Sequence, residues 1–488
     1  MRELPIGLAD PAAAPARLPA GVDVPDPVLQ RLRDGCATVL VDGIDEAGRD
    51  WWPLSLIWAA QGRTTARPAA VAVPTSAQEV AAVLRVCDDA RIPVTPAAGR
   101  SGVCGAAVPA YGGVLLDLQQ LAGIRDVDDA SLLVDVLPGT YGDVFEDELR
   151  SEHRLTVGHW PQSVAISTVG GWLACRGAGQ YSTRYGKIED IVAGLDVVLA
   201  DGRHITTGDQ PRQAVGPDLT QLFVGSEGTL GVIVGARLRA HPLPTAERRG
   251  AWGFPSFIAA LDAMRRVLRR GATPAVFRLY DEVESKRSFD VETNVLLALD
   301  EGDPRLVDAV LHVVGEECAQ AQRLDDALVD RWLTHRNDVS ALEALISRGY
   351  VVDTMEVTGP WSALPAIYER TVAAMLAVKG TAAASAHQSH SYVDGGCLYF
   401  TFGAMVEPDA REDYYRAVWD AGTRAVLEAG GSLSHHHGVG LNRSRFVGEA
   451  LGPAYDMLVA VKQALDPHGI LNPGKLGLPS PFGEVPWP

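Results

Sequence analysis

The stretch PQSVAISTVGGWLACRGAGQYSTRYGKIEDIV, residues 161–192, places glycine, serine and threonine between short apolar runs. Two other glycine-rich segments accompany it, PAAGRSGVCGA at 96–106 and VGSEGTLGVI at 224–233. Glycine lets the backbone approach a ligand closely and leaves its N–H groups free to donate. Each segment alone could be an ordinary loop, but the three together indicate backbone wrapped around one large, flat ligand.

The first segment spaces its glycines as G-x-x-G-x-x-G, at Gly99, Gly102 and Gly105. That spacing differs from the G-x-G-x-x-G fingerprint of a dinucleotide-binding βαβ unit, and no G-K-[S/T] follows as in a P-loop. These two nucleotide-binding motifs are therefore excluded. Taken by itself, the segment is also compatible with a plain tight turn.

The surrounding sequence alternates strand and helix patterns, which predicts an α/β or α+β fold. Thr75 or Ser76 begins a helix, because Gln78 or Glu79 follows three residues later as in a capping box. Expected strands cover 69–73, 92–95, 114–118, 132–136, 191–200 and 232–238, and expected helices cover 75–90 and 141–149.

From about residue 248 the pattern becomes richer in long helical stretches. Expected helices cover 257–270, 304–327, 363–378, 411–429 and 453–465, with a buried strand at 396–405. These changes divide the chain into an N-terminal arm and entry segment (1–65), a ligand-binding domain (66–245), a cap (246–430) and a closing C-terminal segment (431–488).

Composition narrows the class of function. The 488 residues carry a net charge of −18, which disfavours binding to nucleic acids or anionic membranes and leaves a small-molecule substrate. No apolar run reaches the ~18 residues that a membrane-spanning helix needs. The six cysteines are scattered and the first 28 residues lack a signal-peptide pattern, so we expect a cytoplasmic protein with buried thiols. The composition also allows a homodimer.

Three consecutive histidines stand in the motif SHHHGVG, residues 434–440. In an extended backbone His435 and His437 would share one face and His436 would point to the other. One or two of them could then reach a substrate anion or a transferring proton. A metal site and a purely structural role are the alternatives.

The three glycine-rich segments, in this order, resemble the FAD-binding domain of the vanillyl-alcohol oxidase and p-cresol methylhydroxylase (PCMH) superfamily. The tail LDPHGILNPGKL, 465–476, resembles the end of the FAD-linked oxidase C-terminal domain. Within the superfamily, GHWPQSVAISTVGGW, YGKIEDIV and GGSLSHHHGVG are most similar to alkyldihydroxyacetonephosphate synthases. The resemblance covers about 65–480 and implies an α+β fold, with a two-subdomain PCMH-type FAD-binding domain and an α+β cap.

This resemblance implies an FAD cofactor. Loop 96–106 contains no histidine that could attach the flavin, so we expect FAD to be bound non-covalently. Arg100 replaces a small residue of the family, and either adds a charge near the pyrophosphate or faces solvent. The residues expected to contact FAD are Pro96, Ala98, Gly99, Arg100, Ser101, Gly102, Val103, Gly105, Ala106, Pro161, Ser163, Ser167, Thr168, Gly170, Gly171, Ala174, Gly177, Gly179, Tyr185, Glu227, Gly228, Gly231 and Ile233.

The same resemblance implies the catalytic residues. It places the family's catalytic tyrosine on Tyr399, with His435–His437 as partners; a phenol with a pKa near ~10 needs a nearby cation or the flavin to act as a base. His390 and Tyr392 are expected to contact substrate. Related D-2-hydroxy-acid dehydrogenases carry a metal beside an E-H-G motif, and this chain has no acid there, so we expect no metal.

One departure concerns the substrate. The synthases have an arginine at the position of Leu342, and Arg336 is the candidate for a shifted equivalent. The implied reaction is a flavin-assisted exchange of an acyl group for an alkyl group. A D-2-hydroxy-acid dehydrogenase or oxidase that transfers hydride to flavin is the alternative, and a non-catalytic flavin-binding scaffold is the second alternative.

Overall fold

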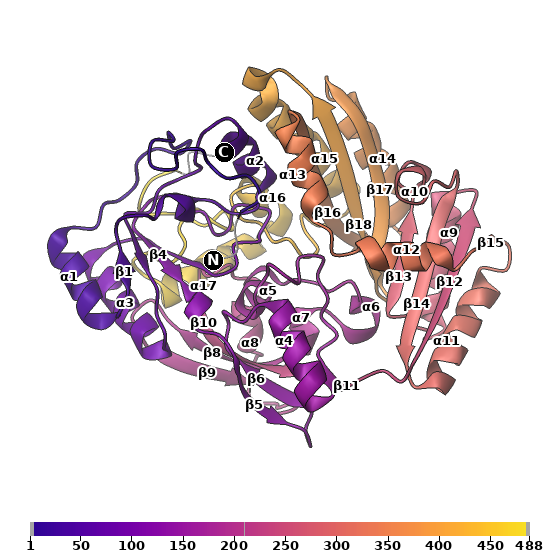
Figure 1. Cartoon of the computed structure of the whole chain (residues 1–488), viewed down its shortest axis with the longest axis horizontal. Coiled ribbons are helices and arrows are strands. Elements are labelled where there is room, and N and C mark those ends of the chain that lie inside the picture. Colours follow the sequence, from indigo (N-terminus) through magenta and orange to yellow (C-terminus); the bar gives the residue numbers. More distant parts are fainter. Residues whose placement is uncertain (1–3, 209, 485–488) are drawn as a thin grey trace.

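The computed structural model describes residues 4–208 and 210–484, which form two lobes side by side (Figure 1). The first lobe begins with a four-stranded sheet in the order β1-β2-β4-β3, in which β2, β4 and β3 run parallel. Its elements are α1 (Asp26–Gly35), β1 (Val39–Leu40), α2 (Pro53–Ala60), β2 (Ala70–Ala72), α3 (Ala77–Ala90), β3 (Val94–Ala97) and β4 (Val114–Asp117).

The start of α3 confirms the expected helix start, with Ser76 as the N-cap. The Ser76 hydroxyl accepts the N–H of Glu79 at 3.2 Å, and the Glu79 carboxylate accepts the N–H of Thr75 at 2.6 Å. The apolar face of α3 then packs in the core of this sheet, together with Leu471 from the C-terminal segment.

The second part of this lobe is an antiparallel five-stranded sheet in the order β5-β6-β10-β8-β9. Short helices pack on it and share its core. Its elements are β5 (Ile124–Asp128), β6 (Leu133–Val136), α4 (Gly142–Glu148), β7 (Leu155–Thr156), α5 (Val169–Cys175), α6 (Ser182–Tyr185), α7 (Ile188–Ile191), β8 (Val192–Val198), β9 (His204–Gly208), α8 (Thr220–Phe223), β10 (Val232–Arg239) and β11 (His241–Pro242).

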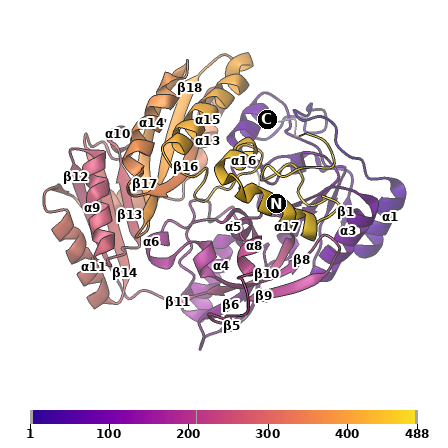
Figure 2. The same cartoon turned by 180° about the vertical axis from the view of Figure 1, so that it is seen from behind.

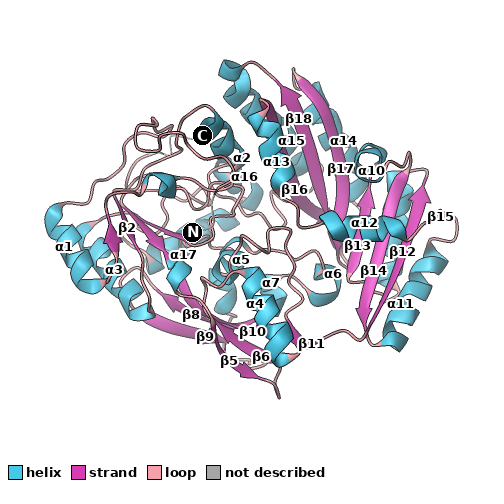
Figure 3. Cartoon of the chain, viewed as in Figure 1, coloured by secondary structure: helices cyan, strands magenta, loops and turns pink. Residues whose placement is uncertain are grey.

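The second lobe is a seven-stranded antiparallel sheet in the order β15-β12-β14-β13-β17-β18-β16 (Figure 3). Helices α9, α11, α14 and α15 share the core on one face, whereas α12 packs on the other face with α6 of the first lobe. Its elements are β12 (Ala246–Phe254), α9 (Phe257–Arg269), β13 (Val276–Tyr280), α10 (Glu282–Phe289), β14 (Asn294–Gly302), α11 (Pro304–Glu317), β15 (Gln322–Leu324), α12 (Ala327–His335), α13 (Ser340–Ser347), β16 (Tyr350–Pro360), α14 (Leu364–Ala377), β17 (Thr381–Ser391), β18 (Gly395–Met405) and α15 (Arg411–Glu428).

The C-terminal segment carries α16 (Val447–Leu451) and α17 (Ala454–Leu465) and returns to the first lobe (Figure 2). Leu471 forms a parallel bridge with Val94 at the start of β3. The Lys475 ammonium donates to the carbonyl of Val108 at 2.9 Å. The end of the chain therefore helps to hold the loop that follows β3.

The expected helix over 304–327 is wrong, because α11 ends at Glu317 and β15 lies between α11 and α12. Strands β12, β13 and β14 also interrupt the range expected to be rich in long helices. Asn294–Asp300 is buried throughout, so its sequence lacks the alternation of a half-exposed strand and gives no period to recognise. All six cysteines are free, and five of them are buried.

Candidate active site

The loop after β3 has room for a ligand at one glycine. A Cβ on Gly102 would meet nothing within 4 Å, and its backbone needs no positive φ. Gly99 and Gly105 differ, since a Cβ there would lie 2.5 Å from the Ile166 carbonyl and 2.9 Å from the Trp52 ring. Open space beside exposed backbone at Gly102 fits a bound pyrophosphate.

Arg100 in this loop is buried, so the alternative that it faces solvent is wrong. Its Nη1 donates to the Glu46 carbonyl at 2.5 Å and to the Arg49 carbonyl at 3.4 Å. Burial lowers the pKa of its guanidinium. Arg100 thus holds the 46–49 turn against the loop, and its expected charge interaction with the pyrophosphate stays a prediction.

The three glycine-rich segments meet in space. Gly99 lies against Ile166 and Thr168, and a Cβ on Gly228 would lie 3.0 Å from Pro96. The Glu227 N–H donates to the Ala174 carbonyl at 2.9 Å. The Thr168 hydroxyl at the start of α5 is buried and has no hydrogen-bond partner among the described residues, which fits a site that FAD completes.

Several of the residues expected to contact FAD have structural partners in the protein. Gly170 packs on Pro138, and the Ser167 hydroxyl accepts the Trp172 indole N–H at 2.7 Å. Tyr185 donates to Glu301 of the cap at 2.7 Å. The buried Glu227 carboxylate accepts the N–H groups of residues 439 and 440, at 2.5 and 2.9 Å, and so tethers the histidine loop to the FAD lobe.

The carboxylate of Glu356 on β16 holds the histidine loop through hydrogen bonds to its backbone. It is fully buried and accepts the backbone N–H groups of His435–His437, at 3.2 Å for His436 and 2.9 Å for His437. The Ser434 hydroxyl and the Arg443 guanidinium also donate to it, at 2.8 and 2.9 Å. Burial alone would raise the pKa of Glu356, but Arg443 and these donors hold it below its ordinary value.

The loop is bent rather than extended, so the expected alternation of the three rings is wrong. The Nδ1 atoms of His435 and His436 lie 2.9 Å apart, and the two rings are nearly perpendicular. The His437 ring lies 4.5 Å from that of His436, and its Nε2 lies 3.2 Å from the Tyr399 hydroxyl. The three N–H bonds to Glu356 hold this bend, which gathers the three rings in one cluster with His437 at the phenol.

Two polar side chains of the cap sheet contact Tyr399, and a carboxylate of α10 supports one of them. Thr354 donates to its hydroxyl at 3.2 Å, and the His387 ring stacks on it at 4.8 Å. Nδ1 of His387 lies 2.8 Å from the Glu284 carboxylate. Strand register brings them together, because Tyr399 on β18 lies opposite His387 on β17 and Glu356 on β16.

Burial sets the protonation states at this site. It lowers the pKa of His437 to about 4 and holds the pKa values of His435 and His436 well below the ordinary histidine value. It raises the pKa of Tyr399. At neutral pH the rings are therefore neutral and the phenol is protonated, so the histidines do not supply the cation expected from the sequence.

His390 and Tyr392 lie against the His435 ring, and His390 also lies against His436. The Ser182 hydroxyl lies 2.7 Å from His390 Nδ1, and the Tyr392 hydroxyl lies 2.9 Å from His435 Nε2. One nitrogen each from His390, His435 and His436 lies within 4.8 Å of the others, a grouping that could hold a metal ion. The expectation that no metal is bound therefore stays a prediction.

Arg336 lies outside the histidine group. Its guanidinium stands 5.0 Å from the Tyr181 ring and 5.6 Å from the Trp160 ring, and no hydrogen bond among the described residues connects it to the histidines. Leu342 on α13 packs at the edge of the cap core. The substrate arginine of the synthases therefore has no counterpart at that position.

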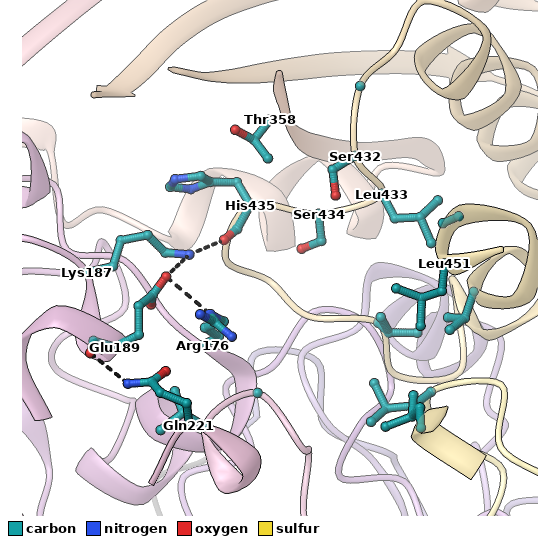
Figure 4. Close-up of a pocket in the computed structure, with 18 of the residues that line it drawn as sticks. Arg176, Lys187, Glu189, Gln221, Thr358, Ser432, Leu433, Ser434, His435 and Leu451 are labelled. Carbon is teal, nitrogen blue, oxygen red and sulfur yellow. Dashed lines mark hydrogen bonds and ion pairs between the residues drawn. The ribbon is translucent and has the colours of Figure 1, made fainter. Parts of the chain in front are cut away.

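A cavity of about 1100 Å³ opens beside His435, between the FAD lobe and the C-terminal helices (Figure 4). On one wall Lys187 donates to the His435 carbonyl at 2.6 Å, and Arg176 pairs with Glu189 at 3.2 Å. Leu433 and Leu451 contribute to the apolar wall. The cavity also reaches Tyr392 but is not lined by Tyr399.

Sequence reasoning missed Glu356, Arg443, His387 and Glu284. Glu356 is the only charged residue in TMEVTGPW, residues 354–361, and a single acid in a buried strand is a usable signal. The other three are recognisable only through strand register and the return of the C-terminal segment, which one sequence does not reveal.

Two sequence families match the chain, "FAD binding domain" over residues 68–208 and "FAD linked oxidases, C-terminal domain" over 243–476. A relative from Escherichia coli O157:H7, "Uncharacterized FAD-linked oxidoreductase YgcU", is 31% identical over 84% of this chain and 89% of its own. An alkyldihydroxyacetonephosphate synthase from Trypanosoma brucei brucei is 28% identical over 90% and 77%. A probable mitochondrial D-lactate dehydrogenase from Danio rerio is 29% identical over 84% and 84%.

Solved structures share the fold. An alkyldihydroxyacetonephosphate synthase superposes with a TM-score of 0.77 at 22% identity, covering 96% of this chain and 88% of that one. p-Cresol methylhydroxylase superposes with a TM-score of 0.77 at 18% identity, covering 93% and 96%. No helix among the described residues is long and apolar enough to cross a membrane. The chain belongs to the FAD-linked oxidase family, with FAD as its cofactor and with the α+β fold that p-cresol methylhydroxylase shares.

Proposed function

We propose that this protein is an FAD-dependent enzyme of the alkyldihydroxyacetonephosphate synthase type, which exchanges an acyl group for an alkyl group on a small polar substrate. The observation that carries this proposal is the 3.2 Å contact between the Tyr399 hydroxyl and His437 Nε2. It gives the tyrosine a neutral acceptor for its proton inside a buried site.

The residues expected to hold FAD are those of the three glycine-rich segments, with Gly102 at the pyrophosphate. Bound FAD supplies an electron-accepting ring, and the protein supplies position and proton transfer. His437 accepts the phenol proton, and the resulting phenolate takes a proton from the substrate carbon. Nδ1 of His437 lies 3.6 Å from the Glu356 carboxylate, so this carboxylate stabilises the imidazolium that forms on His437.

Support for this assignment comes from the residues around Tyr399. Burial raises the pKa of the phenol and lowers that of His437 to about 4, so both shifts oppose proton transfer from Tyr399 to His437. The transfer therefore depends on the Glu356 carboxylate, which stabilises the imidazolium that it forms. Thr354 donates to the same oxygen and stabilises negative charge as it develops there. The synthase-like motifs at 158–172, 185–192 and 430–440 and the 28% identical relative point to the same reaction.

A second candidate is a D-2-hydroxy-acid dehydrogenase or oxidase, in which a histidine accepts the hydroxyl proton while hydride leaves for the flavin. Two observations favour it: a leucine at the synthase arginine position, and the 29% identical D-lactate dehydrogenase relative. In this reaction His435 or His436, beside His390, is the base, and Tyr399 contributes little.

An anaerobic titration separates these functions. The purified protein is mixed with 2-hydroxy acids, acyl-ketone phosphates and aryl alcohols, and flavin absorbance is followed. Perturbation by acyl-ketone phosphates without lasting reduction supports the synthase type, and full bleaching by 2-hydroxy acids supports the dehydrogenase. A flavin spectrum that responds to none of them supports a scaffold without catalysis and contradicts both enzymes.

A further inference from the structure

The histidine loop contacts two tyrosine hydroxyls, one at each end of the cluster of rings. His437 Nε2 lies 3.2 Å from the Tyr399 hydroxyl, and His435 Nε2 lies 2.9 Å from the Tyr392 hydroxyl. Of these four residues, Tyr392 and His435 line the cavity beside the C-terminal helices, whereas Tyr399 and His437 do not. A proton released at Tyr399 therefore reaches that cavity only by way of other groups.

The cavity gives the second pair access to solvent. Leu451 and Met457 line it and are 42% and 71% exposed, so it opens at the surface. Its volume of about 1100 Å³ has room for many water molecules, since each occupies ~30 Å³ in the liquid. His435 lies on its polar wall next to Lys187 (Figure 4). Water in the cavity can thus exchange protons with the Tyr392–His435 pair.

Both ring nitrogens of His435 are engaged. Nε2 faces the Tyr392 hydroxyl, and Nδ1 lies 2.9 Å from Nδ1 of His436. A neutral imidazole carries one N–H and one bare nitrogen, so it donates one of these hydrogen bonds and accepts the other. A ring placed in this way can accept a proton on one side and release a proton on the other.

His436 forms the inner end of this chain. Its Nδ1 contacts His435, and its Nε2 makes no hydrogen bond to a residue that the structure describes. The His436 ring centroid lies 6.0 Å from that of Tyr399 and 4.5 Å from that of His437. Nε2 of His436 is therefore the nitrogen of the chain that is available to a molecule reacting beside Tyr399.

The contact between the two Nδ1 atoms allows two proton arrangements. In one, Tyr392 donates to His435, His435 donates to His436, and Nε2 of His436 carries a hydrogen. In the other, His436 donates to His435, His435 donates to Tyr392, and Nε2 of His436 is bare and accepts a proton. Only hydrogens differ between the two arrangements, so the chain can change from one to the other without moving a ring.

The surroundings keep these three groups neutral and in place. Burial holds the pKa values of His435 and His436 well below the ordinary value and that of Tyr392 well above it, so no proton is trapped along the chain. Lys187 donates to the His435 carbonyl at 2.6 Å. The Ser182 hydroxyl lies 3.3 Å from that of Tyr392 and gives it a second partner when its hydrogen turns.

We propose that His436, His435 and Tyr392 form a proton relay between the buried reaction site and the cavity. A proton from the substrate, or from the alcohol that enters in exchange, binds Nε2 of His436, which passes its Nδ1 proton to Nδ1 of His435. His435 passes its Nε2 proton to the Tyr392 oxygen, and Tyr392 gives its own hydroxyl proton to water in the cavity. One proton leaves the site, and only N–H and O–H bonds change.

The relay deepens the proposed function and rests on the site being catalytic. It serves the exchange reaction and also the hydride-transfer alternative, because both release a proton inside the site. A metal ion held by His390, His435 and His436 is the competing use of the same nitrogens, since a ligated nitrogen has no lone pair for a proton. One equivalent of zinc or manganese in the purified protein, measured by elemental analysis, would overturn the relay.

Chemical rescue by imidazole tests the middle of the relay. His435→Ala removes the ring but keeps the backbone N–H that Glu356 accepts. Turnover per bound flavin, on the substrate that the anaerobic titration identifies, should fall by ~10² or more. Added imidazole should recover at least tenfold of this loss, because the cavity gives it access to the place of the ring.

His437→Ala is the matched variant for rescue. It belongs to the same loop and also donates its N–H to Glu356, but it does not line the cavity. Its turnover should fall without recovery in imidazole. Absence of rescue in His435→Ala, or equal rescue in both variants, would overturn the relay.

Tyr392→Phe tests the outer end. Its turnover should fall about tenfold or more with normal FAD content, and its solvent deuterium isotope effect should exceed that of the wild type, because proton exit becomes slow. Tyr414→Phe is the control, since this buried phenol contacts the Thr381 hydroxyl at 3.0 Å, outside the cavity. It should keep the wild-type rate and isotope effect. Wild-type values in Tyr392→Phe would contradict its place in the relay.

A measurement on the FAD-loaded protein without substrate completes the test. Nitrogen-15 NMR of labelled histidine should show opposite tautomers at His435 and His436. Tyr392→Phe should shift the ring nitrogens of both, although among the described residues its hydroxyl bonds only to His435 and Ser182. Equal tautomers, or a shift confined to His435, would contradict the relay.

The outcomes separate the relay from the proposed function. Normal turnover in Tyr399→Phe, with imidazole rescue of His435→Ala intact, would overturn the tyrosine chemistry and leave the relay serving a 2-hydroxy acid. Equal tautomers and no rescue, with Tyr399→Phe inactive, would overturn the relay alone.

Discussion

Glu356 and Tyr399 lie opposite each other on the neighbouring strands β16 and β18, and the ring of His437 spans their side chains. Nε2 of His437 is 3.2 Å from the phenol oxygen, and Nδ1 is 3.6 Å from the carboxylate. The neutral ring of His437 thus lies between a proton donor, the Tyr399 hydroxyl, and a buried negative charge, the Glu356 carboxylate. The predictions below follow from it and from the glycine-rich site beside it.

FAD should be released when the protein is denatured by acid or heat. Loop 96–106 holds no histidine, and the open space at Gly102 suits non-covalent binding. After precipitation the yellow colour should remain in the supernatant, as measured by flavin absorbance. Flavin retained in the washed pellet would contradict non-covalent binding.

Gly102→Val should lower FAD content strongly while folding survives. The new side chain would meet no protein atom within 4 Å of its Cβ, so it has no clash with the protein, yet it would fill the space assigned to the pyrophosphate. Bound flavin per chain is the measurement, and circular dichroism checks the fold. Gly7→Val, another open glycine without positive φ, is the control. Equal FAD content in the two variants would mean that the pyrophosphate does not bind at Gly102.

Glu356→Gln should destabilise the fold and lower turnover per bound flavin. Removing the charge leaves the Arg443 guanidinium buried without its ion pair, at a cost of about 3–5 kcal/mol in the free energy of unfolding. It also removes the carboxylate that stabilises protonated His437. Chemical denaturation and steady-state kinetics measure the two effects.

Asp353→Asn is the control for this change. Asp353 is buried on the same strand, but it accepts from Tyr415 and Trp419 in the helical core, and burial raises its pKa to about 7. Its amide variant should cost less stability and leave turnover per flavin unchanged. Equal kinetic losses in both variants would mean that Glu356 acts only through general stability.

Stability should fall as pH drops from ~6.5 towards about 4, the folded-state pKa of His437. Between these pH values the histidine is protonated in the unfolded chain but stays neutral in the folded protein. The free energy of unfolding therefore decreases on acidification. Asp353 and Glu146, whose pKa values burial raises to about 7, act in the opposite direction. The difference in the pH dependence of the free energy of unfolding between wild type and His437→Gln gives the contribution of His437.

His437→Gln should therefore show a shallower loss of stability with acid, measured by denaturation at a series of pH values. Replacement of the exposed His312 by glutamine should leave the slope unchanged. A steeper slope in His437→Gln than in wild type would contradict the neutral, buried state of this ring.

The sequence predicts the FAD lobe better than the cap. Ser76 and Glu79 reveal the start of α3, and the glycine-rich segments carry their own spacing, because caps and turns are local features. β14 was missed because both its faces are buried, which removes the alternation that marks a strand. β15 was missed because its three residues are specified by pairing with β12 and not by a local pattern.

The same distinction holds at the active site. Tyr399 and the three histidines are recognisable as motifs, but which ring meets the phenol depends on a bend imposed by Glu356, which lies far away in sequence. The protonation states also follow from burial, which a motif does not contain.

The central claim is that the Tyr399 hydroxyl passes its proton to His437 in the slow step. Tyr399→Phe removes only that hydroxyl, so FAD content should stay normal. Turnover per bound flavin on the best substrate of the panel should fall by ~10²–10⁴. His437→Gln should give a similar loss, and the double variant should lose less than the product of the two, because residues acting as a unit fail together. Near-normal turnover of Tyr399→Phe would contradict the account and leave hydride transfer from a 2-hydroxy acid as the better description.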